Sequence, residues 1–324
     1  MLKMKKKSNL IILGCTGFIG RNLTQYFAQK KNYNVYGTYF KRKPWRDKKI
    51  KFLKADLTNK NHVNKVLKKM DIVIQAAATT TGAKDIVSKP FIHVTDNAVI
   101  NSYVMRSAYE NYNKLVVFLS CSVMYKSSNR PILEKELDLN KDPYPAYFGA
   151  AWMKIFIEKT CEFFSRLGKT KFLVIRHSNI YGPYDKYDLD KSHVFGATIT
   201  KVMTNKNNRI EVWGKGTERR DFLYVDDLVD FISLAIKKQK TNFELVNVSY
   251  GKSFPIKDIV SKIIKISGKK IKISFNKSKP TIKTTISLSN NLVKKKFGWH
   301  PKTKIDTGIK KSIIWWKNHN NRIK

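Results

Sequence analysis

The sequence predicts an α/β protein that combines a doubly wound parallel sheet with a smaller, discontinuous carboxyl-terminal lobe. Three observations support this prediction. Short apolar runs alternate with helix-like segments up to about residue 180, a glycine-rich turn separates the first run from the first helix, and the alternation breaks from about residue 181. Apolar runs that are rich in β-branched residues and separated by helices are typical of a parallel sheet covered on both faces.

The elements of the first part follow one another in a regular order. Strands are expected at 9–14, 33–40, 50–57, 71–78, 114–122 and 171–183, and helices at 21–31, 63–70, about 94–112 and around Lys154. Because helices separate most of these runs, the runs are expected to lie side by side in one sheet.

After residue 181 the pattern changes. "YGPYDKYDLDKSHV" is a loop rich in Gly, Pro and Asp, "FELVNVS" (243–249) is expected to rejoin the main sheet, and the tail ends in an amphipathic helix opened at Asp306. The second lobe should therefore lie over the carboxyl ends of the strands, where open α/β sheets bind ligands. The expected boundaries are 1–180 and 221–249 for the sheet domain, and 181–220 and 250–324 for the lobe.

Composition narrows the class of protein. The 324 residues are 42% hydrophobic and carry a net charge of +40, mostly from lysines scattered through every segment. Scattered lysines favour compositional drift and an anionic small ligand over a nucleic-acid partner, which is not expected. The three cysteines, Cys15, Cys121 and Cys161, form no metal-binding or disulfide pattern, and no apolar run reaches the roughly 20 residues of a membrane span. We expect a cytoplasmic protein without a metal.

The turn "GCTGFIG" predicts a dinucleotide-binding Rossmann domain. Three glycines stand between the first strand and the first helix, where they allow a tight turn, close backbone approach to a pyrophosphate and close helix–strand packing. The helix amino terminus then points at the phosphates. The residues expected to contact the cofactor here are Gly14, Thr16, Gly17, Phe18, Ile19 and Gly20.

The end of the second strand favours NADP(H) over NAD(H). In "VYGTYFKRK" no carboxylate is present to hold the ribose 2′-hydroxyl of NAD, whereas Lys41 and Arg42 are placed to pair with a 2′-phosphate. The alternative is that both are exposed loop charges. Asp56 and Leu57 after the third strand fit the adenine, and Ala76, Ala77 and Ala78 after the fourth allow close passage of the cofactor, although a turn acid and small packing residues explain them too.

Together with "SNIYGP", "RRDFLYVDDL" and the tail "FGWHPKTKIDTGIKKSIIWW", the turn resembles the extended short-chain dehydrogenase/reductase superfamily over essentially the whole chain. Within it, the segments around "YDKYDLDKSHVFGATITKV" look most like the GDP-fucose synthase branch. That branch epimerises GDP-4-keto-6-deoxymannose and reduces its 4-keto group with NADPH. The resemblance implies a nucleotide-sugar substrate and a homodimer formed through a four-helix bundle that includes the helix around Lys154.

The resemblance also implies a catalytic Tyr-x-x-x-Lys pair, with a Ser or Thr that orients the sugar hydroxyl. Alignment on Lys154 places Ala150 at the tyrosine position. Cys121 stands at the usual Ser/Thr position, next to Ser122, and Val123 stands where the branch has its epimerising cysteine. Lys154 is therefore expected to bind the nicotinamide ribose, while C3/C5 epimerisation is not expected.

Two accounts of the missing acid stay open. In the first, Tyr147 replaces it, either from the same helix face seven positions before Lys154 or from an irregular helix start after two prolines, and Ser122 or Cys121 orients the substrate. In the second, the acid is lost, which typically costs about 10²- to 10⁴-fold in rate. The chain then binds nucleotide sugar without useful turnover.

The substrate phosphates are marked by arginine. Arg220 in "ERRDF", with Arg219, matches the residue that clamps the diphosphate in relatives, because a guanidinium fork suits two phosphate oxygens. Asn179 and Tyr184, on either side of "YGP", are expected to contact the phosphate or the sugar. We therefore predict an NAD(P)-dependent nucleotide-sugar epimerase or reductase acting at sugar C4. The alternatives are a catalytically silent binding protein and, from charge alone, an RNA-binding relative.

Overall fold

The computed structural model describes residues 6–79, 91, 94–189, 192–279 and 281–319. Seven parallel strands form the main sheet in the order β10-β6-β5-β4-β1-β2-β3. This confirms the predicted doubly wound parallel sheet. The strands are β1 (Ser8–Leu13), β2 (Tyr33–Tyr39), β3 (Ile50–Lys54), β4 (Ile72–Gln75), β5 (Leu115–Leu119), β6 (Lys171–His177) and β10 (Phe243–Val248).

Side chains of each strand alternate between two buried layers, as the pleat of a strand requires. In β1, Leu10 and Ile12 enter one hydrophobic core while Ile11 and Leu13 enter the other. The first core is covered by α1 (Phe18–Ala28), α7 (Val225–Lys238) and α9 (Asn291–Phe297), and the second by α2 (Lys60–Leu67), α4 (Thr95–Glu110) and α5 (Phe148–Arg166). Burial on both faces explains why these strands read as continuous apolar runs.

The expected strand over 171–183 is wrong in one respect, because the chain changes sheets inside it. β6 ends at His177, and the Ser178 amide still bonds the Val248 carbonyl at 3.1 Å. The next segment, β7 (Asn179–Tyr181), pairs instead with β9 (Arg219–Tyr224) of the second lobe. A single apolar run thus serves two sheets, which its hydrophobic pattern alone does not reveal.

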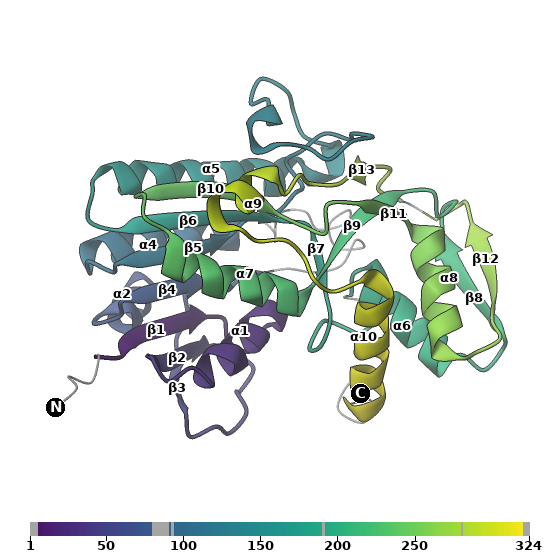
Figure 1. Cartoon of the computed structure of the whole chain (residues 1–324), viewed down its shortest axis with the longest axis horizontal. Coiled ribbons are helices and arrows are strands. Elements are labelled where there is room, and N and C mark those ends of the chain that lie inside the picture. Colours follow the sequence, from purple (N-terminus) through teal and green to yellow (C-terminus); the bar gives the residue numbers. More distant parts are fainter. Residues whose placement is uncertain (1–5, 80–90, 92–93, 190–191, 280, 320–324) are drawn as a thin grey trace.

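The lobe has its own small sheets and core. β9 lies between β11 (Ser253–Pro255) and β13 (Thr285–Ile286), and β8 (Arg209–Trp213) pairs with β12 (Lys272–Asn276). The remaining helices are α6 (Val194–Thr204), α8 (Ile256–Ser267) and α10 (Ile305–His319). Figure 1 shows the main sheet on one side, this lobe on the other, and β7 and β9 between them. The carboxyl ends of the main strands face the lobe.

Two short 3₁₀ turns, Glu134–Glu136 and Pro145–Tyr147, precede α5. The expected return of "FELVNVS" to the main sheet is confirmed by β10, which pairs with β6 at the sheet edge. Within the described residues, every helix falls short of the length and apolarity that a membrane span requires.

Candidate functional site

The glycine turn forms a tight cradle between β1 and α1. Gly14 has φ +77°, and a Cβ there would lie 2.7 Å from the Ala77 Cα; a Cβ at Gly20 would lie 2.2 Å from the Gly14 carbonyl oxygen. Helix α1 begins at Phe18 without a side-chain cap and without an acidic residue in its first turn. Its open amide groups and positive dipole end are suited to an anion, so the cradle fits the pyrophosphate of a dinucleotide.

A cleft of about 1060 Å³ runs from this cradle along the carboxyl ends of β1, β2, β3 and β4. The predicted cofactor residues that line it are Gly14, Thr16, Gly17, Phe18, Lys41, Arg42, Asp56, Leu57, Ala76, Ala77 and Ala78. Ile19 and Gly20 instead lie within the first turn of α1, and Lys154 lies on α5 with its Nζ bonded to the last residue of β5; none of the three lines the cleft. The cleft thus brings together segments that are far apart in the sequence.

The cleft is lined by both acidic and basic side chains. Asp56 accepts hydrogen bonds from the Thr58 hydroxyl at 2.7 Å and the Thr58 amide at 2.9 Å, and these bonds lower the pKa of its carboxyl. Lys41 and Arg42 are exposed at the end of β2. A third cation, Arg21, was missed in the sequence; its guanidinium carbon lies 4.6 Å from the Trp45 ring centroid. Its position directly after the third glycine is the signal that could have revealed it.

The opposite wall of the cleft comes from the lobe. Tyr184 stacks on the Arg21 guanidinium at 4.1 Å, accepts a hydrogen bond from the Gln25 amide at 3.3 Å, and packs edge-on against Trp315 at 5.0 Å. His319 of α10 stacks on Trp315 at 4.5 Å and also lines the cleft. The structure therefore places Tyr184 beside the first helix, in the same cleft as the glycine cradle, and its contact with substrate stays a prediction.

Lys154 belongs to α5, and its side chain reaches the carboxyl end of β5. Its Nζ donates a 2.8 Å hydrogen bond to the Leu119 carbonyl oxygen and sits 4.7 Å from the Phe118 ring centroid. Burial lowers the pKa of this ammonium, and the nearby Cys121 and Glu158 side chains oppose that shift. Cys121 and Ser122 are half-buried beside it, and burial raises the pKa of the Cys121 thiol.

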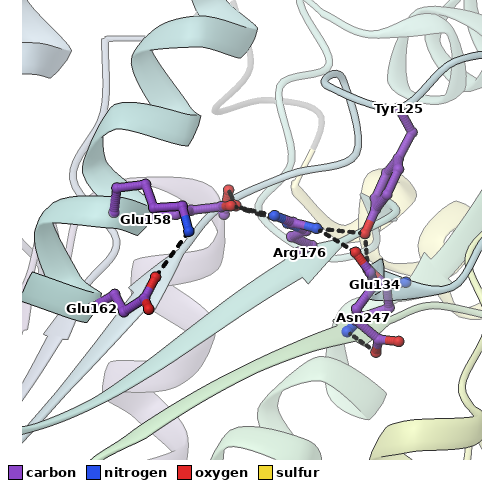
Figure 2. A network of polar contacts seen from close by, with 8 residues as sticks. Tyr125, Glu134, Glu158, Glu162, Arg176 and Asn247 are labelled. Atoms are coloured by element: carbon purple, nitrogen blue, oxygen red, sulfur yellow. Dashed lines mark hydrogen bonds and ion pairs between the residues drawn. The ribbon is translucent and has the colours of Figure 1, made fainter. Parts of the chain in front are cut away.

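A buried polar network, drawn in Figure 2, lies next to Lys154 through Glu158. The Arg176 guanidinium donates to Glu158 at 2.6 Å and to the Tyr125 hydroxyl at 2.8 Å. Ser120 donates to the other Glu158 oxygen at 2.6 Å, and Tyr125 donates to the Asn247 side chain at 2.9 Å. Burial raises the pKa of Tyr125 to about 12, so this phenol stays protonated. The network fixes β5, β6, β10 and α5 relative to one another.

Tyr147 occupies the residue directly before α5, at the end of the 3₁₀ turn, with φ −106° and ψ 0°. The helix therefore begins irregularly after the prolines. The phenol interacts with Arg220 and lies near Cys121, and burial raises its pKa despite the arginine. The pKa of Lys154 responds instead to Cys121, Glu158 and Cys161. Tyr147 is thus joined to the predicted phosphate clamp, while Cys121 is the side chain whose charge acts most strongly on the pKa of Lys154.

The predicted phosphate ligands lie along the first residues of β9 and β7. Arg220 is held by the carbonyl oxygens of Thr284 and Ile282, the latter at 2.6 Å. Arg219 donates to the Ser253 carbonyl oxygen at 2.8 Å. The Asn179 amide donates to the Asp221 carbonyl oxygen at 3.1 Å, and its side chain is exposed. All three side chains are therefore held by backbone carbonyl oxygens of the lobe, and their contact with a phosphate stays a prediction.

A parallel sheet with a glycine cradle at its first crossover, and a second lobe over its carboxyl ends, defines a dinucleotide-binding enzyme fold of the extended short-chain dehydrogenase/reductase type. The model of the NAD dependent epimerase/dehydratase family matches residues 10–249. The chain belongs to this family.

Named relatives agree with the family. GDP-L-colitose synthase of Yersinia pseudotuberculosis is 27% identical over 96% of this chain and 99% of its own length. GDP-L-fucose synthase of Sinorhizobium fredii is 33% identical over 80% of this chain and 83% of its own. UDP-glucose 4-epimerase of Thermotoga maritima, with UDP-glucose, has the same fold with a TM-score of 0.85, at 20% identity over 96% of this chain and 99% of that one. The chain is therefore similar to NAD(P)-linked enzymes of nucleotide-sugar chemistry.

Proposed function

We propose that this protein is an NADP-dependent enzyme that transfers a hydride at the sugar C4 of a GDP-linked 6-deoxyhexose or a close analogue, either reducing its 4-keto form or epimerising its 4-hydroxy form. Two observations carry the proposal. The glycine cradle lines the cleft, and the Lys154 Nζ bonds the last carbonyl oxygen of β5; Cys121 lies near both Lys154 and Tyr147, and Tyr147 interacts with Arg220. The similarity to GDP-L-fucose synthase and GDP-L-colitose synthase supports the guanine nucleotide and the deoxysugar.

We assign the cofactor and the substrate to different sets of residues. When bound, the nicotinamide cofactor supplies or accepts a hydride at the sugar carbon. The glycine cradle holds its pyrophosphate, and the ammonium of Lys154 holds its ribose near the end of β5. Arg219 and Arg220, with Asn179, hold the diphosphate of the sugar nucleotide. Tyr147 and Cys121 line the space between, where Tyr147, Cys121 or Ser122 donates a hydrogen bond that orients the sugar.

The test is consumption of NADPH with a panel of 4-keto nucleotide sugars that differ in base and in deoxygenation. Oxidation of NADPH with a GDP-linked 4-keto-6-deoxyhexose supports the proposal, and identification of the product gives the stereochemistry at C3, C4 and C5. NADPH binding without turnover of any panel member would instead support a catalytically silent binding protein. That second function is favoured by the interaction of Tyr147 with Arg220, together with the sequence prediction that Ala150 stands at the tyrosine position.

Lys41 and Arg42 are expected to set the preference for NADP(H). Replacing both by alanine removes two charge-assisted contacts with the 2′-phosphate, each worth about 1.5–3 kcal/mol. The dissociation constant for NADPH should rise by roughly 10²-fold or more, while that for NADH changes little. Energy transfer from tryptophan to the reduced nicotinamide measures both constants. Lys43→Ala in the same loop is the matched control, and equal losses for the two cofactors would contradict the assignment.

The outer face of α5 is expected to form a homodimer. Phe156 and Phe163 are 55% and 56% exposed and lie two helical turns apart on one face, next to α4. Phe156→Asp with Phe163→Asp places two charges on that face and should convert a dimer to a monomer in sedimentation velocity. Lys310→Ala, at an exposed position of α10 in the lobe, should leave the dimer intact. A monomeric wild-type protein at micromolar concentration contradicts this prediction.

A further inference from the structure

The tyrosine position on α5 is filled by Ala150, so another group must exchange a proton with the sugar oxygen if C4 is reduced or oxidised. Such a group has to lie near Lys154, at the ends of β5 and β6. In these two parallel strands Leu119 stands opposite Ile175, and the Ser120 amide bonds the Ile175 carbonyl at 2.8 Å. Cys121 and His177 each follow the last residues paired between these two strands by two positions, and the charge of Lys154 acts on both side chains.

His177 is the last residue of β6 and is half-buried, just before the chain crosses to the lobe. Its Nδ1 lies 2.7 Å from the Ser178 carbonyl oxygen. A carbonyl oxygen only accepts hydrogen bonds, so Nδ1 carries the proton and the neutral ring presents its lone pair at Nε2. Within the described part of the chain Nε2 makes no hydrogen bond. The imidazole is therefore held by one nitrogen and offers the other as a base.

The electrostatic surroundings keep this base neutral. The pKa of His177 is lowered to about 4, mainly by burial and in smaller part by the Lys154 ammonium, although the bond to the Ser178 carbonyl raises it. The Cys121 thiol and the Tyr147 phenol stay protonated, because burial raises the pKa of both groups. At neutral pH, His177 is thus the group beside Lys154 that is ready to accept a proton, whereas the thiol and the phenol hold theirs.

We propose that His177 exchanges the proton of the sugar 4-hydroxyl, in the place that the tyrosine holds in relatives. In the oxidising direction the O–H bond breaks and its proton moves to Nε2. The O–H electron pair then forms the C=O bond, and the hydride leaves C4 for the oxidised nicotinamide. In the reducing direction the imidazolium returns the proton to the oxygen. In this direction the neutral ring must first take up a proton from solvent, so the reducing rate should rise as the pH falls toward the pKa of His177. This inference rests on the proposed function and names its proton-transfer residue.

The kinetic test compares three variants in the NADPH assay. His177→Gln should lower kcat by about 10²- to 10⁴-fold, the usual range for a lost general acid or base. NADPH affinity, measured by fluorescence, should stay within about threefold of wild type. Tyr147→Phe should mainly raise KM, and His300→Gln, at an exposed histidine, should change neither constant. Turnover of His177→Gln within threefold of wild type overturns the inference, as does complete loss of turnover in Tyr147→Phe alone.

A second measurement does not depend on turnover. Titration of the histidine ring signals by NMR should show His177 neutral down to about pH 5, and Lys154→Met should raise its pKa. The His300 signal should not move between the two proteins. If the His177 ring titrates near the ordinary histidine pKa and Lys154→Met does not change that pKa, the inference is wrong. If NADPH binds but no nucleotide sugar reacts with wild type, the proposed function fails instead, and the proton role fails with it.

Discussion

Gly20→Ala is expected to abolish dinucleotide binding. The added Cβ would lie 2.2 Å from the Gly14 carbonyl oxygen and 2.9 Å from the Gly14 carbonyl carbon, distances that side-chain carbons do not tolerate. Both contacts are with backbone, so no rotamer change relieves them. Helix α1 must move away from β1, which displaces the open amides at its amino terminus from the pyrophosphate. NADPH affinity should fall by more than 100-fold in fluorescence titration.

The same variant should lose stability, because overpacking of this kind costs about 1–3 kcal/mol. Gly17→Ala is the informative comparison. Its Cβ would lie 3.3 Å from the same Gly14 oxygen, in a backbone conformation that alanine accepts. It should retain most of the thermal stability yet bind NADPH poorly, because the methyl group stands where the backbone must approach the phosphates. Gly20→Ala protein that binds NADPH within threefold of wild type contradicts this account of the cradle.

The cradle was predictable from sequence because its constraints are local. Gly14, Gly17 and Gly20 stand at fixed offsets between one strand and one helix, and the short-range geometry of a turn dictates their positions. The strands of the main sheet were predictable for a similar reason, because a strand that is buried on both faces needs a continuous run of apolar residues. Arg219 and Arg220 were also predicted from sequence. They begin β9, the lobe strand that leads directly into α7 on the main sheet.

Residues that depend on tertiary placement were not predictable in the same way. Tyr147 meets Arg220 because a 3₁₀ turn ends at Tyr147 and delays the start of α5. Tyr184 lies on Arg21 because the lobe folds back over the first helix. His177 comes close to Lys154 only because β5 and β6 are neighbours in the sheet. In each case the partner is many residues distant, and no local pattern encodes the encounter.

Arg176→Met is expected to cause the largest loss of stability. Arg176 and Glu158 form an ion pair at 2.6 Å, and their side chains are only 6% and 3% exposed. Removal of the guanidinium leaves the Glu158 carboxylate buried without its cation and takes a partner from Tyr125. Breaking a buried pair in this way typically costs 3–5 kcal/mol. Chemical denaturation followed by circular dichroism measures the free energy of unfolding.

Two further variants separate the charge from the packing. Arg166→Met removes the arginine of an exposed pair with Glu162 on the same helix, where the arginine side chain is 74% exposed, and should cost only a few tenths of a kcal/mol. The double variant Glu158→Met with Arg176→Met removes both buried charges, so it should be more stable than Arg176→Met alone. Equal losses in the single and double variants would show that the cost comes from packing rather than from an uncompensated carboxylate.

Arg176→Met is also expected to change the position of Lys154 and with it the binding of NADPH. Glu158 lies near Lys154 and accepts the Ser120 hydroxyl, and Ser120 directly precedes Cys121. When Arg176 no longer holds Glu158, the carboxylate is free to move toward the Lys154 ammonium and to draw it from the Leu119 carbonyl. Arg176→Met protein that is still folded at low temperature should therefore bind NADPH more weakly than Arg166→Met. Unchanged affinity would mean that the buried network stabilises the fold without setting the position of Lys154.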